Sequence, residues 1–195
     1  MGLLVLTSVV SVTFIVERGL ALRMGRVVPP ALETALENCR SAEDLPRLRE
    51  ICLREPSALG RLLMVGAEHR DGPKEENENI LQTKARHEIA QLERGLVVLE
   101  IATGIAPLLG LVGTVYGMIV LFANIGTAGM ADNTAGADFA RGIALALRST
   151  LGGLLIAIPS LIAWSYYTRK VETMAVEMEN LCEEFLRRLY RSVKS

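Results

Sequence analysis

Three long runs of this chain contain no charged residue, and they constrain its fold more than any other feature. Asp, Glu, Lys, Arg and His are absent from Met1–Val16, Ile101–Ala131 and Ser149–Thr168. A helix needs roughly 20 apolar residues to cross a hydrocarbon core of about 30 Å. The second and third runs have that length. The first would span about 24 Å as a helix and is long enough if side chains at its end reach the interface. We therefore predict an all-α membrane protein with three transmembrane helices.

The composition supports this fold class and argues against several functions. Mean hydropathy is +0.32, although 22% of the residues are charged. The net charge of −1 does not indicate a nucleic-acid partner. Cys39, Cys52 and Cys182 have no metal-ligand spacing, so we expect free thiols in a reducing compartment. We expect no metal, no cofactor and no enzyme activity, because the chain has no nucleophile–base set and no phosphate-binding loop.

Groups of basic residues lie at corresponding ends of the three runs. They follow the first run, precede the second and follow the third, at Arg18, Arg23, Arg26, Lys84, Arg86, Arg94, Arg169 and Lys170. The connection between the second and third runs contains Asp132 and Asp138 but no Lys or Arg from about Asn124 to Asp138. The positive-inside rule then places the N-terminus in the periplasm and the tail in the cytoplasm. The expected segments are a first span at 1–22, a cytoplasmic helical segment at 23–95, a second span at 96–125, a short periplasmic connection at 126–140, a third span at 141–168 and an amphipathic tail helix at 169–195.

Two of the three spans are expected to extend into long cytoplasmic helices. A helical pattern runs from Glu75 without Gly or Pro as far as Gly95, and we expect it to continue into the second span. The tail carries an apolar stripe formed by Met174, Met178, Leu181, Cys182, Phe185 and Leu189. This stripe needs a cover from a helix of another chain or from a neighbouring cytoplasmic helix of this one, and the second does not exclude the first.

Small residues recur along the second and third spans. They are Gly104, Gly110, Gly113 and Gly117 in the second span, and Gly142, Ala146, Ser149, Gly153 and Ala157 in the third. Lipid tails are as apolar as leucine, so membrane helices associate through close contact at small residues. The spacing predicts tight packing between these spans. Pro107 and Pro159 each remove a backbone donor and are expected to kink their helices.

Each of these spans also contains a threonine well inside its apolar run, Thr114 in the second and Thr150 in the third. One interpretation is structural, because a helix threonine often donates a hydrogen bond to the carbonyl four residues before it. The other is functional, because a hydroxyl can both donate and accept a hydrogen bond inside a bundle. The pairing of two threonines on adjacent glycine-rich spans leaves both interpretations open.

These residues together resemble the ExbB/TolQ proton-channel family, which is related to the MotA stator subunit. The resemblance covers about residues 86–168, with weaker similarity at the Glu17-Arg18 pair. It rests on Leu92–Leu96, Ile101–Ala102, Ala106–Ile119, Gly142–Ala144, Ala146–Leu147, Thr150, Gly153–Leu154 and Ala157–Pro159.

The resemblance implies a homo-oligomeric ring, a pentamer, in which the second and third spans line a central pore. That pore would hold the transmembrane helices of a dimer of an ExbD- or TolR-like single-span subunit, whose carboxylate takes up and releases protons. The residues matching Thr114 and Thr150 would relay the protons. The ring would lie in the lipid bilayer of a bacterial inner membrane and energise envelope transport through a TonB- or TolA-like protein. The coupling ion would be H⁺, and a threonine ring is also compatible with Na⁺.

The chain departs from the family pattern at Leu145, where many ExbB-type members have a glutamate five residues before the threonine of the third span. Because no carboxylate lies in either apolar run, the titrating group is expected to come from another chain. Arg148 is expected to snorkel to the interface, or to pair with a partner or lipid group. Two alternatives stay open: a TolQ-like or gliding-type stator, and a membrane scaffold that conducts no ions.

Overall fold

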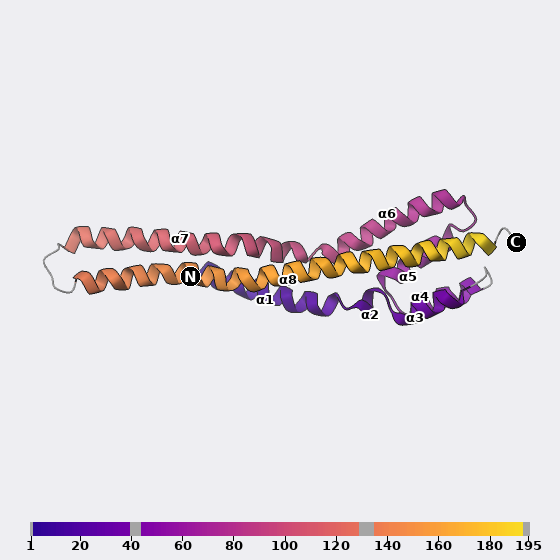
Figure 1. The fold of residues 1–195 in the computed structure, drawn as a ribbon, viewed down its shortest axis with the longest axis horizontal. Coiled ribbons are helices and arrows are strands. Elements are labelled where there is room, and N and C mark those ends of the chain that lie inside the picture. Colours follow the sequence, from indigo (N-terminus) through magenta and orange to yellow (C-terminus); the bar gives the residue numbers. More distant parts are fainter. Residues whose placement is uncertain (1, 40–43, 129–134, 193–195) are drawn as a thin grey trace. The chain divides into compact units, whose positions relative to one another are not determined.

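The computed structural model describes residues 2–39, 44–128 and 135–192, and every regular element in these ranges is a helix. The helices are α1 (Gly2–Ala21), α2 (Met24–Val27), α3 (Pro30–Asn38), α4 (Leu45–Arg54), α5 (Ala58–Glu68), α6 (Lys74–Glu93), α7 (Leu96–Ala128) and α8 (Ala135–Ser192) (Figure 1). Three segments are long and apolar enough to cross a membrane, namely Gly2–Ala21, Leu96–Ala123 and Phe139–Arg191. The predicted all-α fold with three candidate spans is therefore confirmed. Asp132 lies outside the described residues.

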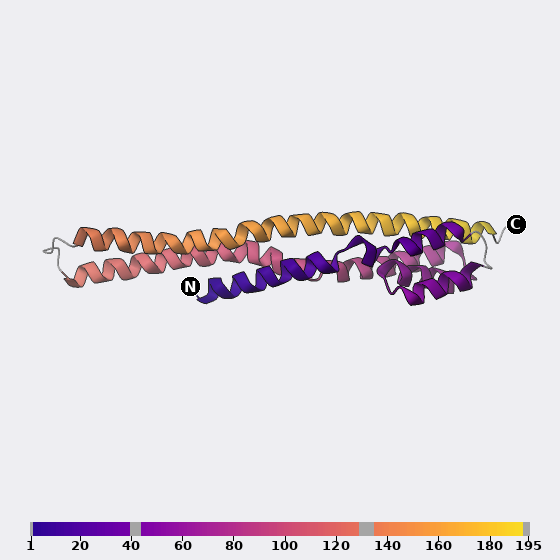
Figure 2. The ribbon, with the colours of Figure 1, turned by 90° about the horizontal axis from the view of Figure 1, so that it is seen from below.

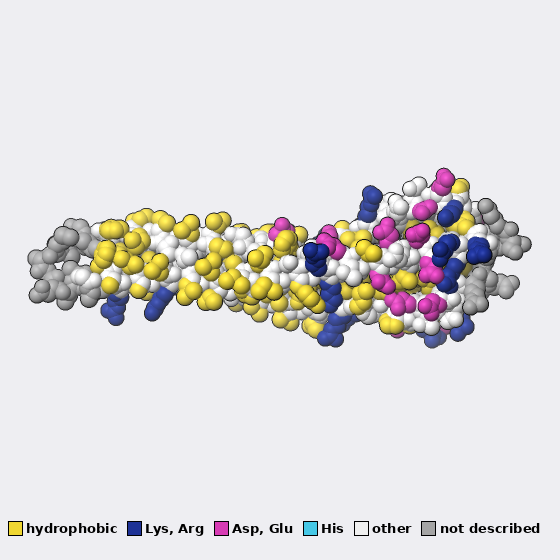
Figure 3. All heavy atoms as spheres, in the orientation of Figure 1, with side chains coloured by type: hydrophobic (Ala, Val, Ile, Leu, Met, Phe, Trp, Pro, Cys, Tyr) yellow, Lys and Arg dark blue, Asp and Glu magenta, His cyan; other side chains and the backbone are white. Residues whose placement is uncertain are grey.

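The described residues form two units, divided after Glu17, after Arg94 and after Tyr166. We call the first the hairpin unit; it contains α1 as far as Glu17, all of α7, and α8 as far as Tyr166. We call the second the charged unit; it contains α2 to α6 and the remainder of α8. Figure 3 shows hydrophobic side chains over the hairpin unit and mixed acidic and basic side chains over the charged unit.

In the hairpin unit, α7 and α8 lie side by side and antiparallel (Figures 1 and 2). Gly110 lies against Thr150 and Gly117 against Ala146, so residue numbers rise along one helix as they fall along the other. Helix α1 runs parallel to α8, because Leu4 lies near Gly152 and Ser11 contacts Ser160. Helices α7 and α8 continue through Pro107 and Pro159 without a break.

A buried hydrogen bond joins α1 to α8 inside the hairpin unit. The Ser160 hydroxyl donates to the Ile156 carbonyl at 2.7 Å, which leaves Ser11 as the donor in the 2.5 Å contact between the two serine Oγ atoms. Ser11 is 2% exposed and Ser160 is fully buried.

We expect the Ser11–Ser160 pair to show a coupling energy of about 1 kcal/mol, the size measured for hydrogen bonds between membrane helices. The measurement is a double-mutant cycle of Ser11→Ala, Ser160→Ala and the double variant, followed by unfolding of the purified protein in detergent. Thr13→Ala is the control partner for Ser160→Ala, because the Thr13 hydroxyl donates to Val9 of its own helix. Additive effects for the serine pair would show that this bond does not hold α1 to α8.

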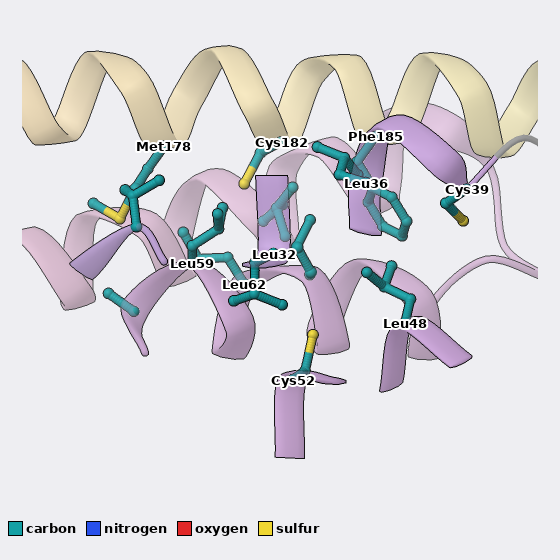
Figure 4. Close-up of a cluster of buried hydrophobic side chains, with 14 of the residues drawn as sticks. Leu32, Leu36, Cys39, Leu48, Cys52, Leu59, Leu62, Met178, Cys182 and Phe185 are labelled. Atoms are coloured by element: carbon teal, nitrogen blue, oxygen red, sulfur yellow. The ribbon is translucent and has the colours of Figure 1, made fainter. Parts of the chain in front are cut away.

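The charged unit has its own hydrophobic core, formed by α3, α4, α5 and the end of α8 (Figure 4). Leu59, Leu62 and Leu63 of α5 are fully buried. Met174 and Phe185 of the tail stripe are 0% and 1% exposed in the same core. The stripe is therefore covered by helices of its own chain, which answers the question that the sequence left open.

An ion pair links α5 to α6 in this unit. The Arg61 guanidinium donates to both carboxylate oxygens of Glu88, at 3.0 Å from Nε and 2.5 Å from Nη2. Glu88 is 2% exposed, and the Lys84 ammonium lies 3.9 Å from its Oε1. The hydrogen bonds to Glu88 raise the pKa of Arg61 above its usual value. A bidentate pair of this kind fixes the orientation of the two helices.

The three cysteines are free and buried, as expected for the thiols, and all lie in the charged unit. Burial raises the pKa of Cys52 to about 11 and also raises the pKa of Cys39. A thiol that stays protonated at neutral pH is a poor nucleophile. These two cysteines are therefore structural residues of the core.

The helix that was expected to run unbroken into the second span is interrupted. Helix α6 ends at Glu93 and α7 begins at Leu96, with a turn at Arg94 and Gly95. Glycine weakens a helix by about 1 kcal/mol relative to alanine, which makes Gly95 a favourable place for the interruption. The third span differs, because α8 is continuous from Ala135 to Ser192.

Candidate functional site

The contact between α7 and α8 is made at glycines. A Cβ atom placed on Gly153 would lie 2.5 Å from the Ala106 carbonyl oxygen and 3.2 Å from the Gly110 Cα. A Cβ on Gly110 would lie 2.9 Å from the Ser149 carbonyl oxygen and 3.0 Å from the Thr150 Cα. Real Cβ atoms do not approach backbone this closely, so only glycine allows the two helices to come together here.

The same seam continues toward the end of α7. A Cβ on Gly113 would lie 2.7 Å from the Ser149 Cβ, and one on Gly117 would lie 3.0 Å from the Ala146 Cβ. Ala157, one turn after Gly153, is 7% exposed. In contrast, a Cβ on Gly104 would meet no atom within 4 Å. The structure therefore brings together most of the small residues singled out in the sequence, and leaves Gly104 outside the seam.

The two threonines lie beside this seam and on the same side of it. Thr114 follows Gly110 by four residues, which is one turn plus about 40°. Thr150 precedes Gly153 by three residues, which places it about 60° round α8 in the same rotational sense. Each threonine is rotated from the glycine seam in the same direction about its own helix axis. Because the two helices are antiparallel, both threonine side chains therefore lie on the same side of the hairpin. We call this side the threonine face.

Helix α1 lies on the opposite side of the hairpin, along the stretch of α8 from Gly152 to Ser160. It contacts α8 at Gly152 and Ser160. Measured around the α8 axis from Gly153, Gly152 lies about 100° and Ser160 about 20° in the direction of rotation opposite to that of Thr150. The buried residues Leu99 and Ala102 of α7 lie on this covered side. On the threonine face, Leu111 is 54% exposed and Leu154 is 42% exposed. Within the described part of the chain, the threonine face has no helix packed over it.

The hydroxyl groups of the two threonines have different partners. Thr114 Oγ1 donates to the Leu111 carbonyl at 2.6 Å, so the structural interpretation holds for its proton. Its oxygen still has lone pairs that accept hydrogen bonds. The Thr150 hydroxyl makes no hydrogen bond to any described residue and is half-buried. Both oxygens are thus open to a group approaching the threonine face.

The two prolines do not lie on one surface. Pro107 precedes Thr114 by seven residues, or two turns less about 20°, and therefore lies on the threonine face. Pro159 follows Thr150 by nine residues, which places it on the opposite side of α8. Only Pro107 is positioned to contact a group that occupies the threonine face.

Leu145 also lies away from the threonine face. It precedes Thr150 by five residues, about 140° round α8, and its side chain is 64% exposed. Arg148 is exposed as well, and so is Arg141 two turns earlier on the same side of the helix. The route by which Arg148 reaches polar surroundings remains a prediction.

One residue of this surface was missed by the sequence reasoning. The charge-free run begins at Ile101, so Glu100 was not considered as a functional residue, although it lies inside the expected span 96–125 and inside the candidate span Leu96–Ala123. Glu100 is exposed and precedes Gly110 by ten residues, about 80° round α7 on the side of Thr114. The signal that would have found it is this helical spacing from the glycines. The second span therefore does contain a carboxylate.

No group of three or more His, Cys, Asp or Glu side chains suited to a metal ion occurs among the described residues. The polar groups of the threonine face include the hydroxyls of Thr114 and Thr150 and the carboxylate of Glu100. Hydroxyls and carboxylates can pass protons to and from a partner's side chain without forming a covalent intermediate.

Comparison with known proteins places the chain in a family. The sequence model of the MotA/TolQ/ExbB proton channel family matches residues 54–180. The putative biopolymer transport protein ExbB-like 1 of Synechocystis sp. is 33% identical over 167 residues, covering 83% of this chain and 63% of that protein. The biopolymer transport protein ExbB of Aquifex aeolicus is 35% identical over 98 residues, covering 50% of this chain and 64% of that protein.

A relative with a different name aligns over more of the chain. The Tol-Pal system protein TolQ of Pseudomonas aeruginosa is 29% identical over 204 residues, covering 97% of this chain and 86% of that protein. The chain spans less than two thirds of the first two relatives that it matches. The match to the family model includes α7, the glycine seam and both threonines. The chain belongs to the MotA/TolQ/ExbB proton channel family.

Proposed function

We propose that the chain is the ring-forming, ExbB-like subunit of a proton-driven motor in a bacterial inner membrane. The observation that carries this proposal is the threonine face. Two hydroxyls lie on one side of the glycine-packed hairpin, and the contacts of α1 are on the other side. Five copies arranged with α1 outward would turn their threonine faces toward a common pore.

The tight seam suits such a ring. Because the α7–α8 contact is made at glycines, each subunit presents a narrow, rigid hairpin. The remaining exposed surface of α7 and α8 is apolar and includes Leu108, Val112 and Leu155 at 60%, 63% and 65% exposure. That surface is suited to lipid or to the next copy. The threonine face is suited to the transmembrane helices of an ExbD- or TolR-like dimer.

The proposed mechanism uses the hydroxyls as relays. A carboxylate on the partner helix takes up a proton on one side and releases it on the other. A threonine hydroxyl donates a hydrogen bond to the charged carboxylate and accepts one from the protonated acid. It does this without a permanent charge in the hydrocarbon region, which would cost several kcal/mol. The work would pass to a TonB- or TolA-like protein, with the N-terminus in the periplasm and the tail in the cytoplasm.

We expect Thr114→Val and Thr150→Val to lower proton flux about tenfold or more, the change that about 1.4 kcal/mol in the barrier produces. Valine keeps the shape of threonine and removes the hydroxyl. The measurement is the decay of an imposed pH gradient in liposomes that contain the ring and its partner. Thr13→Val is the matched control, because this exposed hydroxyl of α1 donates to its own helix. Equal flux in the wild type and the two variants would contradict the relay.

Two alternatives are distinguished by related results. A TolQ-like stator, suggested by the coverage of the Pseudomonas aeruginosa protein, would conduct protons but require a Tol-type partner for activity in cells. A scaffold without ion conduction, suggested by Leu145 in place of the family glutamate, would give no flux above that of empty liposomes. The geometry favours conduction, because Leu145 lies away from the threonine face.

A further inference from the structure

Glu100 is the only charged residue of α7, whose sequence runs from Leu96 to Ala128. It is the fifth residue of the helix and lies inside the candidate span Leu96–Ala123. An ionisable side chain inside a membrane span is costly and therefore marks a candidate functional site. The role of Glu100 depends on its depth in the span, on the side of α7 from which its side chain projects and on the groups that it contacts.

The depth follows from the α7–α8 contact. Ala106 lies against Gly153, and Glu100 precedes Ala106 by six residues, or about 9 Å along the helix. In an antiparallel pair this places Glu100 level with the part of α8 near Pro159. That part belongs to the charge-free run Ser149–Thr168, about 15 Å before Arg169. Glu100 is therefore level with apolar residues of α8 and lies about 6 Å inside the start of its own span at Leu96.

The direction follows from helical spacing and burial. Leu99 and Ala102, on the side that α1 covers, are 0% and 5% exposed. Glu100 and Thr103 lie on the other side and are exposed and half-buried, respectively. The Thr103 hydroxyl donates to the backbone carbonyl of Glu100 at 2.6 Å. Glu100, Thr103 and Thr114 thus form one polar line along the threonine face.

The Glu100 carboxylate has no ion pair or hydrogen bond with any described residue. The residues of α8 level with it, near Pro159, are not titratable, and α1 has no titratable group before Glu17. Along the chain, the nearest charged groups are Glu93 and Arg94, before α7 begins. The first cation of α1, Arg18, donates to the Leu92 carbonyl at 3.3 Å. Among the described residues no cation is paired with the Glu100 carboxylate, which leaves it available to the space that the threonine face lines.

We propose that Glu100 is a carboxylate of the ion path that this chain itself supplies, acting on the cytoplasmic side of the two threonines. This inference rests on the proposed function. Glu100 lies about 21 Å from Thr114 along α7, too far for direct transfer. In the proposed step, the Glu100 carboxylate accepts a proton released by the partner's acid and becomes a neutral carboxylic acid. It then loses the same proton to water at the cytoplasmic end and returns to the charged form.

The test compares Glu100→Gln with the wild type in liposomes that contain the ring and its partner. We expect proton flux to fall about tenfold or more, since acid–base groups contribute at least that much to proton transfer. We also expect the dependence of flux on pH to lose one titration step, an effect that a purely structural role would not produce. Glu100→Asp keeps the carboxylate and is expected to restore most of the flux. Glu172→Gln, at an exposed position of α8, is the matched control and should leave flux unchanged.

A relocation variant tests the direction of the side chain. In the double variant Glu100→Ala with Ile101→Glu, the carboxylate moves about 100° round α7, away from the threonine face. We expect this variant to conduct as poorly as Glu100→Gln, and wild-type flux in it would overturn the proposal. Wild-type flux in Glu100→Gln, with flux lost in Thr114→Val, would overturn the role of Glu100 alone. Unchanged flux in Thr114→Val and Thr150→Val would instead contradict the proposed function.

Discussion

Replacing Gly153 by alanine is expected to force α7 away from α8 and to dissociate the proposed ring. The added methyl carbon would lie 2.5 Å from the Ala106 carbonyl oxygen, and backbone cannot yield as a flexible side chain does. Alanine favours a helix over glycine by about 1 kcal/mol, but overpacking a tight contact costs about 1–3 kcal/mol or more. We expect a net loss of about 2 kcal/mol per subunit, seen as a lower melting temperature in detergent and as monomers in native mass spectrometry.

Gly104→Ala provides the matched control for this prediction. Gly104 lies in the same helix as Gly110, but a Cβ atom there would meet nothing within 4 Å. The substitution should leave the oligomer intact and raise helix stability slightly. If Gly153→Ala formed the oligomer with an unchanged melting temperature, the glycine seam would not be what holds the hairpin together.

Replacing Arg61 by alanine is expected to destabilise the charged unit by about 2–4 kcal/mol. The substitution leaves Glu88 buried without its bidentate partner, and breaking a buried pair in this way costs about 3–5 kcal/mol. The loss should be somewhat smaller here, because the Arg61 side chain is 44% exposed and Lys84 remains 3.9 Å from the carboxylate. The measurement is denaturant unfolding of the purified full-length protein, monitored by circular dichroism.

The control for Arg61 is Arg54→Ala, which removes an ion pair with Glu50 on the surface of α4. Both side chains of that pair are well exposed, at 76% and 62%, and exposed pairs contribute about 0.5 kcal/mol. Replacing both Arg61 and Glu88 by apolar residues should recover much of the lost stability. Equal effects of Arg61→Ala and Arg54→Ala would show that burial of Glu88 is not the reason for the loss.

The sequence was sufficient to predict the spans and the packing residues, because both depend on local patterns. Charge-free runs have one physical explanation at this length, and small residues four apart lie on one side of a helix. The helical period alone places three glycines on a common side of α7, namely Gly110, Gly113 and Gly117. The cover of the tail stripe could not be predicted in this way. Phe185 packs against residues more than 100 positions earlier, and no local pattern specifies such a contact.

Glu100 shows why the polar surface was described only in part. A count of charge-free residues stops at the first carboxylate, so Glu100 was passed over although the expected span 96–125 contains it. The structure adds the register between α7 and α8, which places Glu100 opposite an apolar part of α8. It also adds α1, which covers one side of the hairpin and leaves the other side open. The helical period of one sequence segment predicts neither how α7 is aligned with α8 nor which side of the hairpin α1 lies on.

The most direct test of the proposed function is whether the threonine face meets water in the proposed ring. Thr114→Cys and Tyr116→Cys differ by two residues, so their side chains point in nearly opposite directions from α7. Native thiols should add little background, because all three are buried and the pKa of Cys52 is raised to about 11. We predict that a membrane-impermeant thiol reagent labels Thr114→Cys in rings without partner, that the partner protects it, and that Tyr116→Cys stays unlabelled in lipid. Labelling of Tyr116→Cys with no labelling of Thr114→Cys would contradict the account.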